Sequence, residues 1–454
     1  MLLSLSTLAM AATGAPAASG NNTASSYDTG GPAGRGGYLL PAGFLSTNGN
    51  QIVDQSGQPV RIAGIGWNGP DGGAGSELSG LEETGYRNVM DSIKADGFNT
   101  IRIPWSNVSL HAMPKPGTVS YIKNPGLQGL NTLGIFDEVV KYAGRIGLKI
   151  IFDHHTDDAG PHDWGGQQAN GLWIDRGPGT DGTDGSGHAG TVTAARFEHD
   201  WVALARHYAG NPTVVGFDLD NEPTGSGQIN WGEGGPTDIH RMCTDVGNAI
   251  QAVNPDALMI CEGPQEWSGP APGMPDGGPD GDLSGVARKP VRLHTPNKVV
   301  YSAHEYPTEI SGQHLSAAEM ISQMNAAWGY LVTQNIAPVW IGEMGSSMRE
   351  RVDPVWAATL LDYMNGRLGS QGGPTFSGNQ QPVSGSWWLA GDNEGQLPDG
   401  IQSAWGPPGH YRPRQQAVTD RMLFRPPSPD DQRSPGALIR RSPPESTGGH
   451  GPPT

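Results

Sequence analysis

The feature that most constrains this chain is a series of eight short apolar segments separated by stretches with helical spacing. The segments are RIAGIGW (61–67), TIRIPW (100–105), KIIFDHH (149–155), VVGFDLDNE (214–222), LMICEG (258–263), VVYSAHEY (299–306), PVWIGEMG (338–345) and SWWLAG (386–391). Most of them are continuous apolar runs, which are typical of parallel strands covered on both faces. We therefore expect a parallel sheet wrapped by helices.

Apolar residues recur at helical spacing between these segments, within 86–93, 136–143, 197–208, 239–250, 320–331 and 356–364. The stretch 265–298 has no such period and predicts an extended loop. Eight strands with intervening helices predict an α/β fold, a (β/α)8 TIM barrel forming a single catalytic domain. A doubly wound open sheet is the alternative. It usually has a glycine-rich phosphate turn after its first strand, and GIGWNG (64–69) does not match that pattern.

The overall composition narrows the partners of this chain of 454 residues. A formal net charge of -17 and a pI near 5.1 argue against nucleic acid and against anionic membranes. The chain contains no run of 18 or more consecutive apolar residues, so the sequence predicts no membrane-spanning segment. The two cysteines, Cys243 and Cys261, are too few for a disulfide scaffold. We expect two reduced core residues, and a single bridge remains open.

The two ends of the chain differ from its centre in composition. Residues 1–38 predict a signal-like segment and flexible leader, with a leucine-rich run and an A-P-A triplet at 15–17 that resembles a cleavage site, although a basic n-region is missing. Residues 411–454 predict a disordered tail rich in Pro, Ser and Arg. The catalytic domain is expected over 39–410, and the enzyme is expected to be secreted or periplasmic.

Most of the predicted strands end in polar or aromatic side chains. Barrel enzymes place their chemistry at the carboxyl ends of the strands. One acid at one strand end could be a helix cap or an ion-pair partner, whereas six strands ending alike indicate an active site. The residues concerned are Arg102, Trp105, Asp153, His154, His155, Asn221, Glu222, His304, Glu305, Tyr306, Glu343, Trp387 and Trp388.

Glu222 and Glu343 end the fourth and seventh strands and would face each other across the barrel mouth. Two carboxyl groups suffice to cleave a glycosidic bond: one protonates the leaving oxygen while the other attacks or activates water. Their pKa values must differ, and Arg102 is the candidate that keeps one of them ionised. Alternation along the fourth strand also predicts that Asp218, Asp220 and Glu222 share one interior face.

Four segments together resemble glycoside hydrolase family 5, in particular its bacterial endo-β-1,4-glucanases. They are GFNTIRIPWS (97–106), NPTVVGFDLDNEP (211–223), VVYSAHEYP (299–307) and NIAPVWIGEMG (335–345). The similarity extends over residues 42–406, so it covers the whole predicted barrel. The N-E-P motif combined with a Glu that ends the seventh strand is specific to this type of enzyme.

The resemblance implies a role for each matching residue. Glu222 matches the acid/base and Glu343 the nucleophile. Asn221 matches the residue that binds the 2-hydroxyl of the sugar. The supporting residues are Arg102 and Tyr306, which match groups that hold the nucleophile, His155 and His304, which match two active-site histidines, and Trp388, which matches the aromatic platform under the sugar. The sequence LAGDNEGQLPDG (389–400) departs from the family pattern, which leaves Trp387 and Trp388 hard to separate.

Tryptophans in loops and at strand ends support a sugar substrate, because pyranose rings stack on exposed aromatic faces. Besides Trp388, we expect Trp67, Trp105 and Trp173 to contact substrate; Trp164 and Trp267 also lie in loops. Three tryptophans on helix faces are expected to pack in the core instead: Trp201, Trp328 and Trp356. The loop 156–192, rich in Gly and Asp, predicts a mobile wall of the cleft.

Other kinds of protein are also compatible with parts of the pattern. The segment DHHTDDAGPH (153–162) could supply ligands to a metal-dependent barrel hydrolase, but barrel metals usually draw their ligands from several strands. A non-catalytic carbohydrate-binding barrel would not need both Glu222 and Glu343. GGPDGDLSG (277–285) could bind calcium, although a solvated loop is the ordinary interpretation.

The sequence thus predicts a monomeric, secreted, retaining endo-β-1,4-glucanase that cleaves internal bonds of cellulose or a related β-glucan. A β-mannanase or another β-glycanase of the same fold is the alternative, because the loops that distinguish these sugars are not recognisable. The expected mechanism requires neither a cofactor nor a metal. In a retaining enzyme the two carboxyl groups lie about 5 Å apart.

Overall fold

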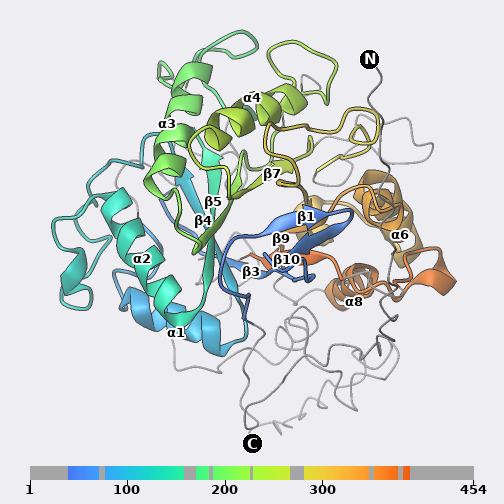
Figure 1. Ribbon diagram of the computed structural model, residues 1–454, viewed down its shortest axis with the longest axis horizontal. Helices are drawn as coiled ribbons and strands as arrows, with labels where there is room; N and C mark the ends of the chain where they lie inside the picture. Colours follow the sequence, from blue (N-terminus) through green and yellow to red (C-terminus); the bar gives the residue numbers. More distant parts are fainter. Residues whose placement is uncertain are drawn as a thin grey trace, which may run out of the picture. The chain divides into compact units, whose positions relative to one another are not determined.

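The computed structural model describes residues 39–70, 77–157, 170–183, 188–224, 229–265, 281–346, 352–376 and 382–388. Eight parallel strands form a closed barrel in the order β10-β3-β4-β5-β6-β7-β8-β9, which confirms the predicted TIM barrel (Figure 1). The strands are β3 (Ala63–Gly66), β4 (Thr100–Ser106), β5 (Lys149–Thr156), β6 (Val214–Asp218), β7 (Leu258–Glu262), β8 (Val299–Glu305), β9 (Val339–Met344) and β10 (Ser384–Trp387). The predicted leader (1–38) and tail (411–454) lie outside the described residues.

Seven of the strands lie within a predicted apolar segment or extend one residue beyond it, whereas β10 begins two residues before its predicted segment and shares only residues 386 and 387 with it. The barrel closes where β10 pairs in parallel with both β3 and β9. The main difference is in β6, which ends at Asp218 although the pattern continues to residue 222. The residues that follow therefore leave the strand geometry before the N-E-P motif is reached.

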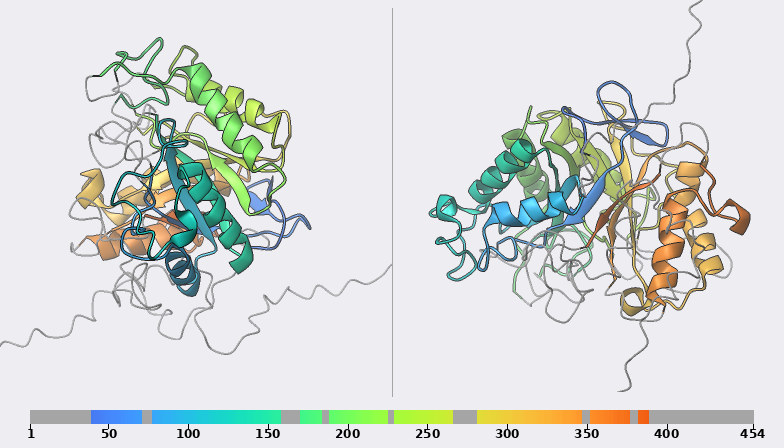
Figure 2. Two further views of the ribbon diagram at one scale, coloured as in Figure 1. Left: turned by 90° about the vertical axis from the view of Figure 1, so that its left-hand side faces the viewer. Right: turned by 90° about the horizontal axis from the view of Figure 1, so that it is seen from below.

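Helices lie outside the strands, as Figure 2 shows, and cover them with the apolar faces that the sequence predicts. The longer helices are α1 (Tyr86–Ala95), α2 (Thr132–Ile146), α3 (Ala194–His207), α4 (Ile239–Gln251), α6 (Ala317–Met324) and α8 (Asp353–Met364). Side-chain caps start several of them: Asn131, Thr193 and Asp238 each accept a backbone N–H of the first turn. Gly147 ends α2 with a φ of 85°, a conformation that suits glycine.

The face predicted over 320–331 is divided in the structure. After α6, a π-helical turn (Asn325–Gly329) leads into α7 (Tyr330–Thr333), and a short helix α5 (Thr308–Ser311) precedes them. Between β7 and β8 the described residues 263–265 and 281–298 contain no helix, in agreement with the predicted extended loop. Short 3-10 turns at Pro125–Leu127 and Gly369–Gln371 complete the described elements.

A hairpin that the sequence analysis missed precedes the barrel. Its strands are β1 (Ser46–Asn48) and β2 (Gln51–Val53), paired antiparallel. Leu45 and Ile52 join a buried cluster with side chains from the barrel strands. Two buried lysines at strand beginnings hold the segment before the hairpin: Lys149 donates to the carbonyl of Gly43 and Lys298 to that of Leu45. The amino-terminal end of the barrel is thereby covered.

Two further expectations concern membrane spans and cysteines. Among the described helices, none has both the length and the apolar character that crossing a membrane requires.

Cys243 on α4 and Cys261 on β7 are buried free thiols, as expected for reduced core residues. Burial, and after it the neighbouring thiol of Cys261, raise the pKa of Cys243 well above its usual value.

Candidate active site

Arg102 on β4 is the centre of the polar cluster at the carboxyl ends of the strands. Its side chain is fully buried. Nε lies 2.9 Å from Oδ2 of Asp218, Nη1 lies 2.5 Å from Oε1 of Glu343, and Nη2 lies 2.9 Å from Oδ1 of Asp153. Nη2 also donates to Oδ1 of Asn221 at 2.8 Å. One guanidinium therefore connects strands β4, β5, β6 and β9 with the segment after β6.

Glu343 on β9 has a second donor on its other oxygen. The Tyr306 hydroxyl donates to Oε2 of Glu343 at 2.7 Å. Burial, and after it the charge of Glu343, raise the pKa of Tyr306 well above its usual value, so the phenol remains a donor. Arg102 and Tyr306 thus complement a negative charge on Glu343, which is the arrangement that the sequence predicts for a nucleophile.

Glu222 lies just beyond β6 and has different partners. Its Oε1 lies 2.8 Å from Nδ1 of His304. Its backbone N–H donates to Oε2 of Glu262 at 2.9 Å. Its φ is 47°, a left-handed conformation that few non-glycine residues adopt. Such strain often marks functional sites, because surrounding contacts must hold it in place.

The two glutamates converge over the barrel mouth. One carboxylate oxygen of Glu222, one of Glu343 and a ring nitrogen of His304 all lie within 4.8 Å of one another. Nδ1 of His304 also lies 3.9 Å from Oε2 of Glu343. The distance of at most 4.8 Å between the Glu222 and Glu343 oxygens agrees with the spacing of about 5 Å expected for a retaining glycosidase.

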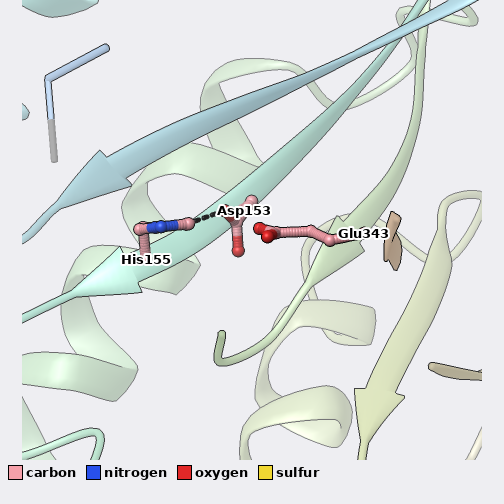
Figure 3. Close-up of side chains that lie close together, drawn as sticks. All are labelled: Asp153, His155 and Glu343. Carbon is pink, nitrogen blue, oxygen red and sulfur yellow. Dashed lines mark hydrogen bonds and ion pairs between the residues drawn. The ribbon is translucent and has the colours of Figure 1, made fainter. Parts of the chain in front are cut away.

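Asn221, His155 and Trp388 border this pair. Nδ1 of His155 lies 2.6 Å from Oδ2 of Asp153. The side-chain amide of Asn221 donates to Nε2 of His155 at 3.5 Å. Figure 3 shows that the Asp153 carboxyl lies between His155 and Glu343. The indole of Trp388 stacks on the His155 ring, with centroids 5.3 Å apart and planes at 8°. The strand ends therefore bring these predicted residues together.

Acids outnumber cations in this cluster, and their environments differ. Burial opposes a charge on Asp153, but Arg102 together with His155 and His154 holds the pKa of its carboxyl below the usual value. Burial raises the pKa of Asp218 to about 6, against the lowering influence of Arg102. Burial, followed by repulsion from neighbouring acids, raises the pKa values of two further carboxyls well above normal, those of Asp220 and Glu262. Neighbouring acids are thus divided between charged and neutral forms.

The structure corrects two of the predicted substrate contacts. Trp67 and Trp105 are both 0% exposed, so neither offers a ring face to a sugar. The Trp67 indole donates to the carbonyl of Ser79. Trp105 has the opposite side-chain direction to Arg102 along β4, and it packs edge-on against Trp201 of α3 at 4.8 Å. It belongs to the layer between barrel and helices.

The other tryptophans divide as follows. Trp173 and Trp388 are 5% and 3% exposed, and their substrate contact stays a prediction. Trp173 lies close to the site, because Thr224 donates to the carbonyl of Gly171 in the same loop. Trp201, Trp328 and Trp356 are core residues, as predicted. Trp164 and Trp267 lie outside the described residues.

The predicted column of three acids on the fourth strand does not form. Asp218 points to Arg102, whereas Oδ1 of Asp220 lies 3.2 Å from Nδ1 of His154. Glu222 contacts His304. Alternation is lost because β6 ends at Asp218 and the chain turns through the positive φ of Glu222.

The metal-ligand cluster considered for residues 153–162 is not assembled by the described part of that segment. His154 contacts Asn107 and Asp220, while His155 contacts Asp153 on the opposite side of β5. Asp153, His155 and Glu343 do lie within 4.8 Å of one another. However, Arg102 is bonded to both acids and already supplies a positive charge there.

Two residues of the site were not identified from the sequence. Glu262 ends β7 and contacts both Glu222 and His304, and its position at a strand end was the same signal that identified the other residues. Asn107 follows β4 directly. It joins His154 to Asp200 of α3 through its amide, a link that no local pattern shows.

Comparisons with known proteins agree with this geometry. Residues 53–393 match the family model described as Cellulase (glycosyl hydrolase family 5). An endoglucanase from Paenibacillus polymyxa is 34% identical over 339 residues, covering 71% of this chain and 77% of the relative. The major extracellular endoglucanase of Xanthomonas campestris pv. campestris is 27% identical over 383 residues, covering 81% and 72%.

Solved structures share the fold. The catalytic domain of the major endoglucanase from Xanthomonas campestris pv. campestris superposes with a TM-score of 0.65 and 24% identity, covering 84% of this chain and 99% of that domain. An endocellulase from Pyrococcus horikoshii, solved in complex with cellotetraose, superposes with a TM-score of 0.66 and 22% identity, covering 85% and 100%.

Proposed function

This chain belongs to glycosyl hydrolase family 5, and on that premise we propose that it hydrolyses internal β-1,4 bonds of cellulose or a related β-glucan with Glu222 and Glu343 as its catalytic pair. It is a glycoside hydrolase of the endoglucanase type. The observation that carries the assignment of the pair is the convergence of the two carboxyl groups within 4.8 Å at the barrel mouth.

In the first step, the Glu343 carboxylate attacks the anomeric carbon and forms a glycosyl ester. The bond between that carbon and the leaving oxygen breaks, and Glu222 transfers its proton to this oxygen. Arg102 and Tyr306 orient the two oxygens of Glu343 for the attack. Asn221 lies beside the pair, where it is suited to bind the 2-hydroxyl of the reacting sugar.

In the second step, a water molecule attacks the same anomeric carbon and the ester bond to Glu343 breaks. The Glu222 carboxylate takes the proton of that water and returns to its acid form. Two inversions at one carbon give overall retention. The proton that leaves with the first product is thus restored by the water, and no redox or metal chemistry is needed to balance the reaction.

Replacing the acid/base tests the assignment directly. Glu222→Ala is expected to lower the rate on cello-oligosaccharides by about 10²–10⁴-fold, and less on substrates with good leaving groups. Azide should restore turnover of the Glu222→Ala enzyme and give a β-glycosyl azide, because the ester intermediate still forms. Azide rescue of Glu343→Ala should instead give an α-glycosyl azide. The reverse pair of products would exchange the two roles.

The preferred glycan is proposed from the names of the relatives, which are endoglucanases. Carboxymethyl-cellulose and barley β-glucan are expected to be cleaved faster than mannan at equal concentration. Faster cleavage of mannan would replace the glucanase proposal by the β-mannanase alternative without changing the roles of the two glutamates.

We further propose that the enzyme is exported and acts as a monomer. The support for export is the signal-like composition of residues 1–38. Amino-terminal sequencing of the mature enzyme from culture medium should show a start after the A-P-A triplet, and light scattering should give the mass of one chain.

A further inference from the structure

Glu262 is a buried acid in contact with the acid/base residue, and the two steps described above do not use it. It ends β7, between β6 and β8, with its side chain fully buried. Its Oε2 accepts the backbone N–H of Glu222 at 2.9 Å and lies 3.3 Å from Nε2 of His304. One carboxyl oxygen therefore touches both supports of Glu222.

The backbone contact acts on a strained turn. A left-handed conformation is strained at a non-glycine residue, and Glu222 adopts it with φ 47°. The preceding residue is anchored separately, because the N–H of Asn221 donates to the carbonyl of His154 at 2.9 Å. The bond from the Glu222 N–H to Glu262 completes the constraint and fixes the direction in which the Glu222 side chain leaves the backbone.

The surroundings of Glu262 favour its neutral form. Burial, followed by the charges of Glu222 and Asp218 on the β6 side, raises the pKa of Glu262 well above its usual value. The Glu222 N–H and Arg102 on β4 lower the pKa of Glu262, but their effect is smaller than the increase caused by burial and by the neighbouring acids. His304 on β8 is the remaining titratable group in contact. A neutral carboxyl can donate a hydrogen bond, which a carboxylate cannot.

The partner for that donor is the outer nitrogen of His304. Within the described residues, neither Nε2 of His304 nor Oε1 of Glu262 has a hydrogen-bond partner, and Oε2 of Glu262 lies 3.3 Å from that nitrogen. If Glu262 donates to Nε2, the imidazole must carry its own hydrogen on Nδ1. Nδ1 then donates to Oε1 of Glu222, 2.8 Å away. Because this oxygen accepts in both ionisation states of Glu222, the transferable proton has to be on Oε2.

We propose that Glu262 is a positioning residue, which acts through His304 and through the Glu222 backbone to keep the transferable proton of Glu222 on Oε2, the oxygen not bonded to His304. The inference rests on the proposed role of Glu222 as acid/base. It predicts that what matters at position 262 is a neutral donor and acceptor, not a negative charge.

Two variants at this position separate the requirements. In Glu262→Gln, the amide nitrogen can donate to Nε2 of His304, but it cannot also accept the Glu222 N–H, because both contacts are made by Oε2 of Glu262. The kcat/KM on cellotetraose is therefore expected to fall by less than about tenfold, with both limbs of the pH profile unchanged. In Glu262→Leu, both contacts are lost in a side chain of similar size. Its kcat/KM on cellotetraose is expected to fall on the order of 10²-fold.

A second substrate distinguishes positioning from general damage. The 2,4-dinitrophenyl β-cellobioside has a leaving group that departs without protonation, so kcat/KM on it should fall less than about threefold in Glu262→Leu. Glu305→Leu is the control, since Glu305 is a half-buried acid at the end of β8 that contacts the Trp328 indole instead of the acid/base. This control should leave the ratio of the two kcat/KM values as in wild type.

An equal fall on both substrates in Glu262→Leu, or a Glu262→Gln enzyme as slow as Glu262→Leu, would overturn the proposal. Nitrogen-15 NMR of His304 gives an independent reading, with the hydrogen expected on Nδ1 in wild type; a hydrogen on Nε2 alone would also overturn it. Failure of the acid/base assignment itself is recognised separately, because Glu222→Ala would then keep its activity on cellotetraose.

Discussion

Arg102 shows how single residues set the electrostatics of the site. Its guanidinium bonds three carboxyl groups, those of Asp153, Asp218 and Glu343, and an amide oxygen of Asn221. Its planar group of five donors can serve several acceptors at once, which the compact ammonium of a lysine cannot. The same side chain thus positions the nucleophile and the residue next to the acid/base.

The Tyr306 hydroxyl is expected to contribute strongly to the rate through its bond to Glu343. A hydrogen bond to a charged group is worth about 1.5–3 kcal/mol, so Tyr306→Phe should lower kcat by about 10- to 100-fold. The measurement is kcat on cello-oligosaccharides at saturation. Tyr330→Phe is the control, because the Tyr330 hydroxyl donates to the carbonyl of Leu283 away from the catalytic pair. Equal kcat values for both variants would contradict this role.

Asp220 illustrates how a network of bonds fixes a protonation state. The Asn107 amide nitrogen donates to Asp200, so the Asn107 oxygen must accept from Nε2 of His154. Burial lowers the pKa of His154 to about 3, so its ring is neutral and Nδ1 can only accept. The group 3.2 Å from Nδ1 is the carboxyl of Asp220, which must then carry a proton. Burial, and after it Asp157, raise the pKa of Asp220 well above normal, in agreement.

The stability of the enzyme should therefore depend on pH through Asp220. An unfolded Asp titrates near 3.9, and the folded carboxyl titrates higher, so the folded state binds more protons between these values and loses stability as pH rises through that window. Asp220→Asn keeps a neutral donor toward His154 and has no such loss. The difference in Tm between Asp220→Asn and wild type should move in favour of the variant as pH rises above about 4. A difference that stays constant with pH would show that Asp220 is charged when folded.

At the scale of elements, the amino-terminal end of the barrel depends on the segment before the hairpin β1–β2. Lys149 and Lys298 begin or precede barrel strands, and each ammonium bonds two backbone carbonyls, one of them in that segment. Burial lowers the pKa values of both ammonium groups. These buried cations thus connect distant parts of the chain through hydrogen bonds to backbone carbonyls.

Removing one of these ammonium groups should loosen the segment without touching the active site. Lys298→Met leaves the carbonyls of Leu45 and Asp256 without this donor, and we expect a loss of about 2–4 kcal/mol in the free energy of unfolding. Urea denaturation measures the loss, and limited proteolysis should cut near the hairpin first. In the control Lys141→Met, an exposed ion pair with Glu138 is lost, which should cost less than about 1 kcal/mol. Equal stability of the two variants would argue against a clamping role for Lys298.

At the scale of the whole barrel, closure brings strand ends from distant parts of the chain to one rim. Glu222 follows β6 and Glu343 lies on β9, yet oxygens of the two side chains lie within 4.8 Å of each other. A water molecule cannot be placed between the sugar and a base at this spacing as an inverting enzyme requires. The geometry of the rim therefore selects between the two stereochemical outcomes.

The product released first should have the β configuration. Proton NMR during the early reaction, before the anomers interconvert, is expected to show the β-anomer of the new reducing end rising ahead of the α-anomer. The Glu222→Ala enzyme without azide serves as the background control. An initial excess of the α-anomer would contradict both the spacing argument and the assignment of Glu343 as nucleophile.

The amino-acid sequence by itself determined the eight strands, the main helices and the position of the functional residues at strand ends. Apolar periodicity is a local property, because covered strands and amphipathic helices are defined by their own neighbours in the chain. The pairing of N-E-P at 221–223 with Glu343 likewise needed only the order of motifs. Strand parity along β4 would also have shown that Trp105 points away from Arg102, had it been applied there.

Only the tertiary structure decided which side chains meet and which carry charge. The end of β6 at Asp218 separates the three acids that strict alternation would align, and the burial of Trp67 removes it as a sugar platform. The neutral state expected for Glu262 depends on groups that β4, β6 and β8 bring together. Such properties follow from desolvation and from Coulomb interactions with residues distant in the chain, and a local pattern contains no information about either.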